Sequence, residues 1–123
     1  MLSYQVYKVV HLLGILLTFT SLGGLMLHVH NGGDKASNKR RGLVAATHGV
    51  GLFLVLLGGF GMLARLKLSF GAVPWVHAKL VIWVILGGVL ALPYRFPKLT
   101  PALWFVVPAL GALAAGFAIY KPF

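Results

Sequence analysis

The chain lacks cysteine altogether and has a single acidic residue, Asp34, among its 123 residues. The absence of cysteine excludes disulfides, thiolate nucleophiles, cysteine-bound zinc and iron–sulfur clusters. The scarcity of carboxylates removes the acidic partner that a hydrolytic catalytic triad needs. Charged residues make up only 10% of the chain, against about 25% in an average soluble domain. A water-soluble monomer could not cover its surface with so few ionic groups, and a hydrophobic share of 59% argues against intrinsic disorder.

The charges that are present are almost all positive, with 11 lysines and arginines and a formal net charge of +10. A strongly basic chain often binds nucleic acid, but such proteins gather their charge on one patch or stripe. Here most of the positive residues lie in short segments between long apolar runs, as expected at a membrane surface that carries anionic lipid. We therefore expect the lipid bilayer as a partner and no binding of nucleic acid.

Four apolar runs are long enough to cross a bilayer, whose hydrocarbon core is about 30 Å thick and needs ~20 helical residues. They extend over about residues 4–27, 42–63, 75–92 and 103–120. The breaks between them are short, so consecutive helices should be antiparallel neighbours. The predicted fold is therefore an all-α, up-down-up-down four-helix bundle that spans a membrane as a single domain, residues 1–123. We expect it in the inner (cytoplasmic) membrane of a bacterium.

The first run carries a polar stripe that a helix surrounded by lipid would not tolerate. At 3.6 residues per turn, one side of this helix carries Tyr7, His11, Gly14, Thr18 and Ser21. Because lipid tails reject polar groups, this side is expected to face the bundle interior. A buried imidazole needs a partner for at least one of its nitrogens, which singles out His11 as a candidate ligand-binding side chain.

The second run begins at about Gly42 and carries His48 followed by five glycines, two of which, Gly51 and Gly58, share a stripe with that histidine. Glycine weakens a helix, so this density needs a reason. One reason is close contact between neighbouring helices. The other is room for a flat, bulky ligand such as a porphyrin, and the sequence leaves both open.

The third run opens with Pro74 and Trp75, which suit a helix that starts at the membrane interface. His77 and Lys79 follow, and they lie about 200° apart around a helix. Only one of the two can face the bundle interior, while the other reaches the headgroups. The fourth run has no ionisable residue before Tyr120, and its Gly/Ala segment at residues 111–116 predicts a packing surface.

The depth of each histidine limits the pairs that could share one ligand. With a rise of about 1.5 Å per residue, His11 lies ~10 Å below one membrane face, near the level of His77. His28 and His48 lie toward the opposite face. Either pair could hold a heme iron between two imidazoles, and we favour His11 and His77.

Heme b is the cofactor that these features favour most. Imidazole is the usual heme ligand in electron-transfer sites, and a four-helix bundle can hold the group between inward-facing histidines. Lysines could pair with the propionates, and Trp75 and Trp83 could form walls of the pocket. The predicted cofactor-binding residues are His11, His77, His48, Lys79, Gly14, Gly51 and Gly58, with His11 and His77 as ligands of the heme iron. A copper or zinc ion on His28 is a weaker alternative, because the sequence has no HExxH motif.

Short motifs carry a resemblance to a group of small four-helix membrane proteins. Residues 7–14 read YKVVHLLG and residues 75–80 read WVHAKL. The chain resembles the HemJ-type protoporphyrinogen oxidases, the CopD-like proteins and the SirB family, with THG at residues 47–49 nearest to the SirB pattern. In the HemJ-type enzymes a first-helix histidine is taken as a heme ligand and a Trp-His-x-Lys motif supplies further essential residues. The resemblance implies these roles for His11, His77 and Lys79, and it implies a heme-dependent oxidoreductase of the protoporphyrinogen oxidase type.

Two functions of different kinds are therefore expected. The first is a b-type, cytochrome b-like heme protein of the membrane that transfers electrons or oxidises a tetrapyrrole. The second is a non-catalytic membrane subunit that packs in a larger complex through Gly/Ala helix faces, with its histidines as hydrogen-bonding core residues. Small-residue faces also favour a homodimer. Colour separates the two, because only the first function predicts a Soret band that depends on histidine.

Overall fold

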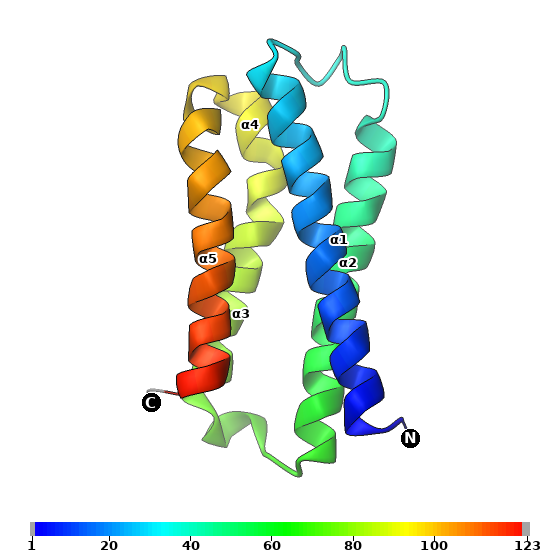
Figure 1. Cartoon of the computed structure of the whole chain (residues 1–123), viewed down its shortest axis with the longest axis vertical. Coiled ribbons are helices and arrows are strands. Elements are labelled where there is room, and N and C mark those ends of the chain that lie inside the picture. The colour runs from blue at the N-terminus through cyan, green and yellow to red at the C-terminus, as the bar shows by residue number, and fades with distance from the viewer. Residues whose placement is uncertain (1, 122–123) are drawn as a thin grey trace.

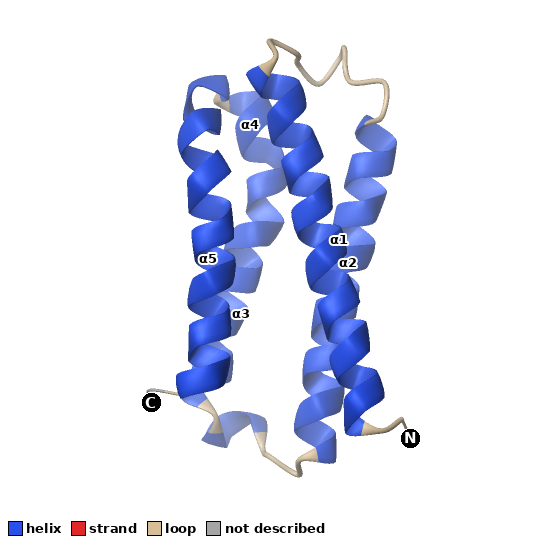
Figure 2. Ribbon diagram, in the orientation of Figure 1, coloured by secondary structure: helices blue, strands red, loops and turns tan. Residues whose placement is uncertain are grey.

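Four helical rods lie side by side and alternate in direction in the computed structural model, which describes residues 2–121 (Figures 1 and 2). All regular elements within these residues are helices. The first two rods are single helices, whereas the third and fourth combine an α-helix with short helical turns. The elements are α1 (Tyr4–His30), α2 (Arg41–Arg65), η1 (Phe70–Ala72), α3 (Pro74–Gly88), η2 (Val89–Ala91), α4 (Leu92–Arg95), η3 (Pro97–Leu99) and α5 (Thr100–Tyr120).

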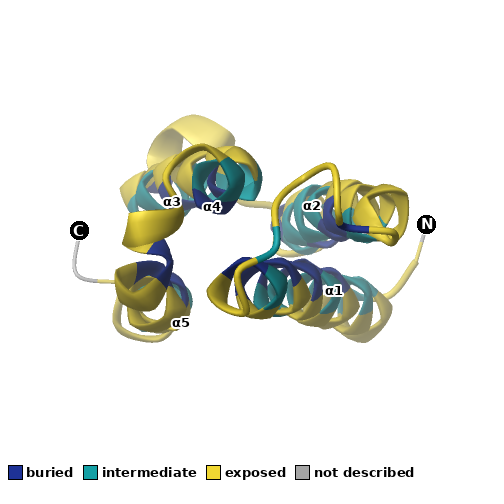
Figure 3. Ribbon diagram, turned by 90° about the horizontal axis from the view of Figure 1, so that it is seen from above, coloured by how far each residue is buried: buried dark blue, intermediate teal, exposed yellow. Residues whose placement is uncertain are grey.

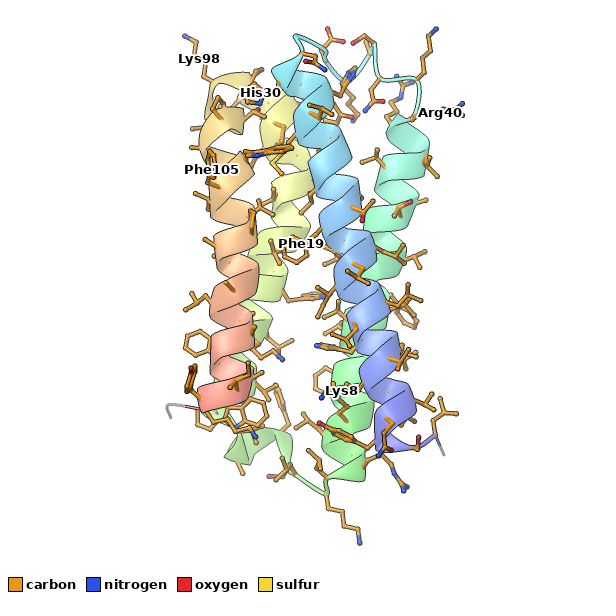
Figure 4. The ribbon with its side chains drawn as sticks, in the orientation of Figure 1. Lys8, Phe19, His30, Arg40, Lys98 and Phe105 are labelled. Atoms are coloured by element: carbon orange, nitrogen blue, oxygen red, sulfur yellow. The ribbon has the colours of Figure 1, made fainter. Side chains whose placement is uncertain are left out.

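Each rod is long and apolar enough to cross a membrane, and the predicted all-α four-helix bundle is confirmed. The candidate spans are Tyr4–His30, Arg41–Arg65, Pro74–Arg95 and Pro97–Tyr120. They run past the predicted ends because long polar side chains can reach the headgroups while their backbone stays helical. Large apolar side chains cover the outer faces, as Phe105 does with 76% of its surface exposed, which suits contact with lipid (Figure 4).

Local chemistry explains where the rods begin and end. The hydroxyl of Ser3 accepts a hydrogen bond from the Val6 N–H at 3.2 Å and caps α1. Pro74 occupies the first turn of α3, where a missing N–H leaves no helical bond unmade. Lys121 follows α5 in a left-handed conformation with a φ of 48°, and this turn ends the helix.

The tightest contact in the bundle is the seam between α1 and α2, the pair of elements that pack most extensively. A Cβ on Gly14 would lie 2.6 Å from the Gly51 carbonyl oxygen, and a Cβ on Gly51 would lie 2.6 Å from the Thr18 hydroxyl. Gly58 meets the backbone of His11 equally closely. These glycines therefore let the two helix backbones approach each other.

The rods form two pairs, α1 with α2 and α3 with α5, and Figure 3 shows them from above. α1 connects the pairs by packing against α5, whereas α2 and α3 make few contacts. The buried apolar cluster between the pairs consists of Leu22, Met26, Ile82, Leu86, Val89, Leu103 and Val107. Most of this core lies in the half of the bundle next to the α1–α2 loop and α4, which we call the closed half (Figure 1). The half near the two chain ends is the open half.

Candidate functional site

A cavity of about 1070 Å³ lies between the two pairs of rods and is lined by residues of α1, α2, α3 and α5. Its walls are mostly apolar and include Trp75, Trp83 and Trp104. Among the few polar side chains on the cavity, His11 comes from α1 and Lys79 comes from α3. Pockets with apolar walls and a few polar groups are the usual form of a site for a small molecule or cofactor.

Small residues on α5 give the cavity its width. Gly111, Ala114, Ala115 and Ala118 line it, so part of the segment predicted as a packing surface faces the cavity. Phe19 extends from α1 toward α5 (Figure 4), and a Cβ on Gly111 would lie 2.7 Å from its ring. Phe19 also packs on the core, and the core residues Met26, Leu86 and Val107 line the cavity as well, so the cavity reaches into the closed half.

His11 is half-buried on the seam side of the cavity, and its ring is held in one orientation. Its Nδ1 lies 2.8 Å from the carbonyl oxygen of Val55 on α2. A carbonyl oxygen only accepts, so Nδ1 carries the proton and donates it. In the neutral ring the lone pair then belongs to Nε2. A histidine whose other nitrogen donates to a backbone carbonyl is the usual arrangement for a metal ligand.

Lys79 is half-buried and lines the cavity from α3. His11 and Lys79 line the same cavity from different helices, so both of these predicted residues face one space. One turn further along, Trp83 donates from Nε1 to the Leu52 carbonyl oxygen at 3.1 Å and ties α3 to α2. This bond fixes the rotation of α3 that turns Lys79 inward.

Two more lysines stand on the rim of the cavity at the end where the chain begins and ends. Lys8 comes from α1 and Lys121 follows α5, and both are exposed cavity-lining residues. The ammonium of Lys121 lies 5.2 Å from the ring centre of Trp75, within the range of a cation–π contact. The rim is therefore positively charged and partly aromatic.

His77 lies outside the cavity, so the structure does not bring it together with His11 as predicted. Its side chain is exposed, its Nε2 donates to the Phe70 carbonyl oxygen at 2.8 Å, and its ring lies 4.3 Å from the Phe70 ring. The physical reason is the angular separation of His77 and Lys79 on one helix. Because Lys79 faces inward, His77 faces away and instead holds the turn before α3.

His48 is buried but does not line the cavity. Its Nε2 donates to the carbonyl oxygen of Leu86 at 3.0 Å, which joins α2 to α3 in the closed half. His28, predicted at a similar depth, bonds instead through Nε2 to the carbonyl oxygen of Asp34 at 2.8 Å in the α1–α2 loop. Neither contact presents a pair of histidines to a shared ligand. His11 lines the cavity, whereas His28, His48 and His77 each bond a backbone carbonyl oxygen elsewhere in the fold.

The α1–α2 loop is organised around its acidic residue. The carboxylate of Asp34 accepts from the Ser37 backbone N–H at 2.8 Å, and this bond holds the pKa of Asp34 below its usual value. Asn38 is buried and donates to the Tyr94 hydroxyl at 2.8 Å, which attaches the loop to α4. The only acid of the sequence thus serves a loop at the end opposite the lysine rim (Figure 1).

The predicted cofactor-binding glycines Gly14, Gly51 and Gly58 lie in the α1–α2 seam and do not line the cavity. Of the two explanations for them, the structure supports close helix packing. Sequence reasoning did not find Trp104 or Lys121, which do line the cavity. The signal for Trp104 is its spacing from Val107 and Gly111, which places all three on one face of α5.

Within residues 2–121, no group of three or more His, Cys, Asp or Glu side chains is placed to hold a metal ion. Comparisons of the chain with protein families, curated proteins and solved structures give no match. The resemblance to the SirB, HemJ-type and CopD-like proteins therefore stays a prediction, and the cavity itself is the basis for assigning a function.

Proposed function

We propose that the chain is a b-type heme-binding membrane protein in which the cavity holds the macrocycle and His11 Nε2 is the iron ligand. One observation carries this proposal: His11 donates from Nδ1 to Val55 at 2.8 Å and lines a cavity of about 1070 Å³. The bound group would supply redox chemistry, as electron transfer or tetrapyrrole oxidation, in the inner membrane of a bacterium.

The size and the walls of the cavity support a large flat ligand. Pockets of roughly 300–1,000 Å³ hold drug-sized ligands, and this cavity reaches the top of that range. Trp75, Trp83 and Trp104 line the cavity and give it aromatic walls, which suit an aromatic ligand. Lys79 offers a positive charge to the acidic side groups of such a ligand.

The geometry favours a single histidine ligand over the pair His11 and His77. Among the residues that the structure describes, His11 is the one imidazole on the cavity wall. Ligation by one proximal histidine is typical of heme proteins that bind small molecules at the iron, whereas two axial protein ligands are typical of electron carriers. Among the described residues, His11 would therefore be the imidazole that holds the bound group.

The contacts of the seam glycines weaken the alternative that the chain is a packing subunit of a larger complex. It depends on glycine faces that need an external partner, and the seam glycines Gly14, Gly51 and Gly58 already meet a helix of the same chain. On α5, Gly111 meets Phe19 within the chain as well.

The test is the absorption spectrum of protein purified from cells supplied with heme. His11→Gln keeps a side-chain donor for the Val55 carbonyl oxygen while removing the imidazole, so the fold should survive. We expect a Soret band in the parent protein and its loss, or at least about a tenfold loss of heme affinity, in His11→Gln.

Two histidines outside the cavity provide matched controls. His77→Gln and His30→Gln remove exposed imidazoles and should leave the band unchanged. A parent protein that stays colourless with excess heme contradicts the proposal. A band that vanishes in His77→Gln as fully as in His11→Gln would restore the bis-histidine pair in place of single ligation.

A further inference from the structure

The charged side chains on the cavity are all positive and come from three separate elements: Lys8 on α1, Lys79 on α3 and Lys121 after α5. No acidic side chain balances them. The only acid in the sequence, Asp34, lies in the α1–α2 loop at the far end of the bundle (Figure 1).

Lys79 differs from the two rim lysines in its depth. Lys8 and Lys121 are exposed, and an exposed lysine at a membrane surface needs no partner beyond water and headgroups. Lys79 lies about 7.5 Å along α3 from Pro74, at 1.5 Å per residue, and is half-buried among tryptophans. A charged group within a membrane span is costly unless an opposite charge compensates it. Among residues 2–121, no acidic side chain lines the cavity beside Lys79, so the anion of a bound ligand would compensate its charge.

We propose that Lys79, supported by Lys8 and Lys121, binds the carboxylate or phosphate of an amphiphilic ligand whose apolar body fills the cavity. The geometry sets the direction of the ligand. Its anionic end lies at the rim, and its apolar end points toward Phe19 and the core. The contact of Lys121 with Trp75 keeps one cation on the rim.

Two sources share this chemistry. For heme the anions are the propionates, and this assignment rests on the proposed function. For a lipid the anion is the headgroup phosphate, and this assignment is independent of the proposed function. Both sources require the same recognition by Lys79, so the experiment has one arm for each.

The first arm uses iron-free protoporphyrin IX and its dimethyl ester, which differ only in their two carboxylates. Binding is followed by quenching of tryptophan fluorescence, and the absence of iron removes any contribution from His11 ligation. We expect the parent protein to bind the acid about tenfold more tightly than the ester. Lys79→Met should abolish this preference and leave ester binding unchanged.

The second arm places the protein in nanodiscs that contain brominated phosphatidylglycerol or brominated phosphatidylcholine. A lipid occupant predicts stronger tryptophan quenching by the anionic lipid, and predicts that Lys79→Met lowers only that quenching. Preference for the porphyrin acid without preference for phosphatidylglycerol identifies the propionates as the anion. Preference for phosphatidylglycerol alone identifies a lipid as the source of the anion, so the anion site stands while the assignment to propionates fails; the heme proposal itself is decided by the Soret band of the His11→Gln test.

Control variants keep the two proposals separate. Lys67→Met removes an exposed lysine from the same end of the bundle, off the cavity, and should change neither arm. Lys79→Arg keeps the charge and should keep the preference for acids, which separates a role in binding from a role in folding. His11→Gln should lose heme ligation but retain the preference for the porphyrin acid over its ester. Equal binding of acid and ester together with equal quenching by both lipids overturns the inference, as does an equal loss of acid and ester binding in Lys79→Met.

Discussion

The closed half and the open half of the bundle are built from the same four rods but from different side chains. The closed half is filled with aliphatic residues such as Leu22, Leu86 and Val107, all of them buried. The open half carries Trp75, Lys79 and His11 on the wall of the cavity of about 1070 Å³. The cavity extends from the open half to the core, where Phe19, Leu86 and Val107 line it.

This contrast separates the part of the molecule that stabilises the fold from the part that can bind a ligand. In the closed half, close packing holds α1 against α3 and α5, and His48 ties α2 to α3. In the open half, the α1–α2 seam and the Trp83 bond to Leu52 maintain the walls without filling the space between them. Substitutions in the two halves should therefore change different measurements.

The largest expected effect is on stability in the closed half. Leu22 is fully buried, so Leu22→Ala should leave a cavity and lower the free energy of unfolding by about 3 kcal/mol. Leu12→Ala on the same helix removes a cavity-lining side chain that is 48% exposed, and it should cost less than about 1 kcal/mol. Reversible unfolding of both variants in mixed detergent micelles measures the difference. Equal losses would mean that the two halves are packed alike.

A second pair of variants examines the seam that holds the walls of the open half. Gly51→Ala places a Cβ 2.6 Å from the Thr18 hydroxyl and should destabilise the protein by about 2 kcal/mol. Gly49→Ala lies two residues away on α2, meets nothing within 4 Å, and should stabilise the helix by up to about 1 kcal/mol. The two substitutions are chemically identical, so opposite shifts of Tm would establish that α1–α2 contact accounts for the seam glycine. Shifts of the same sign would refute that explanation.

The fold could be predicted from the sequence because it depends on lengths and average hydropathy. A bilayer fixes how long a spanning helix must be, and the four runs satisfied that length without any knowledge of their partners. The predicted third span ended at residue 92, whereas the helical rod continues through η2 and α4 to Arg95. The miss arises because a charged residue at a membrane face does not terminate a helix.

The site could be predicted only in part, because it depends on how each helix is rotated. The sequence indicated that His77 and Lys79 face opposite ways, but the direction of each is set by contacts from other helices, such as the Trp83 bond to Leu52. The glycine stripe likewise had two explanations until Thr18 and the backbone of α1 were found against it. The prediction that His11 faces the interior agrees with its place on the cavity wall, because a polar stripe on a helix in lipid has one permitted direction.

The smallest expected effect on stability, combined with a large effect on binding, comes from filling the cavity. Ala115 is an exposed residue that lines the cavity on α5, so Ala115→Phe should occupy ligand space and change the free energy of unfolding by less than about 0.5 kcal/mol. Ala112→Phe adds the same ring at an exposed position on the same helix, off the cavity wall, and is the matched control. Porphyrin binding by Ala115→Phe should weaken by about tenfold or more, since the added ring and the ligand cannot share the space. The stability of the two variants is compared by their Tm, and their affinity for porphyrin is compared by titration. If Ala115→Phe binds porphyrin as the control does, the open half is not the binding site and the contrast between the halves has no functional meaning.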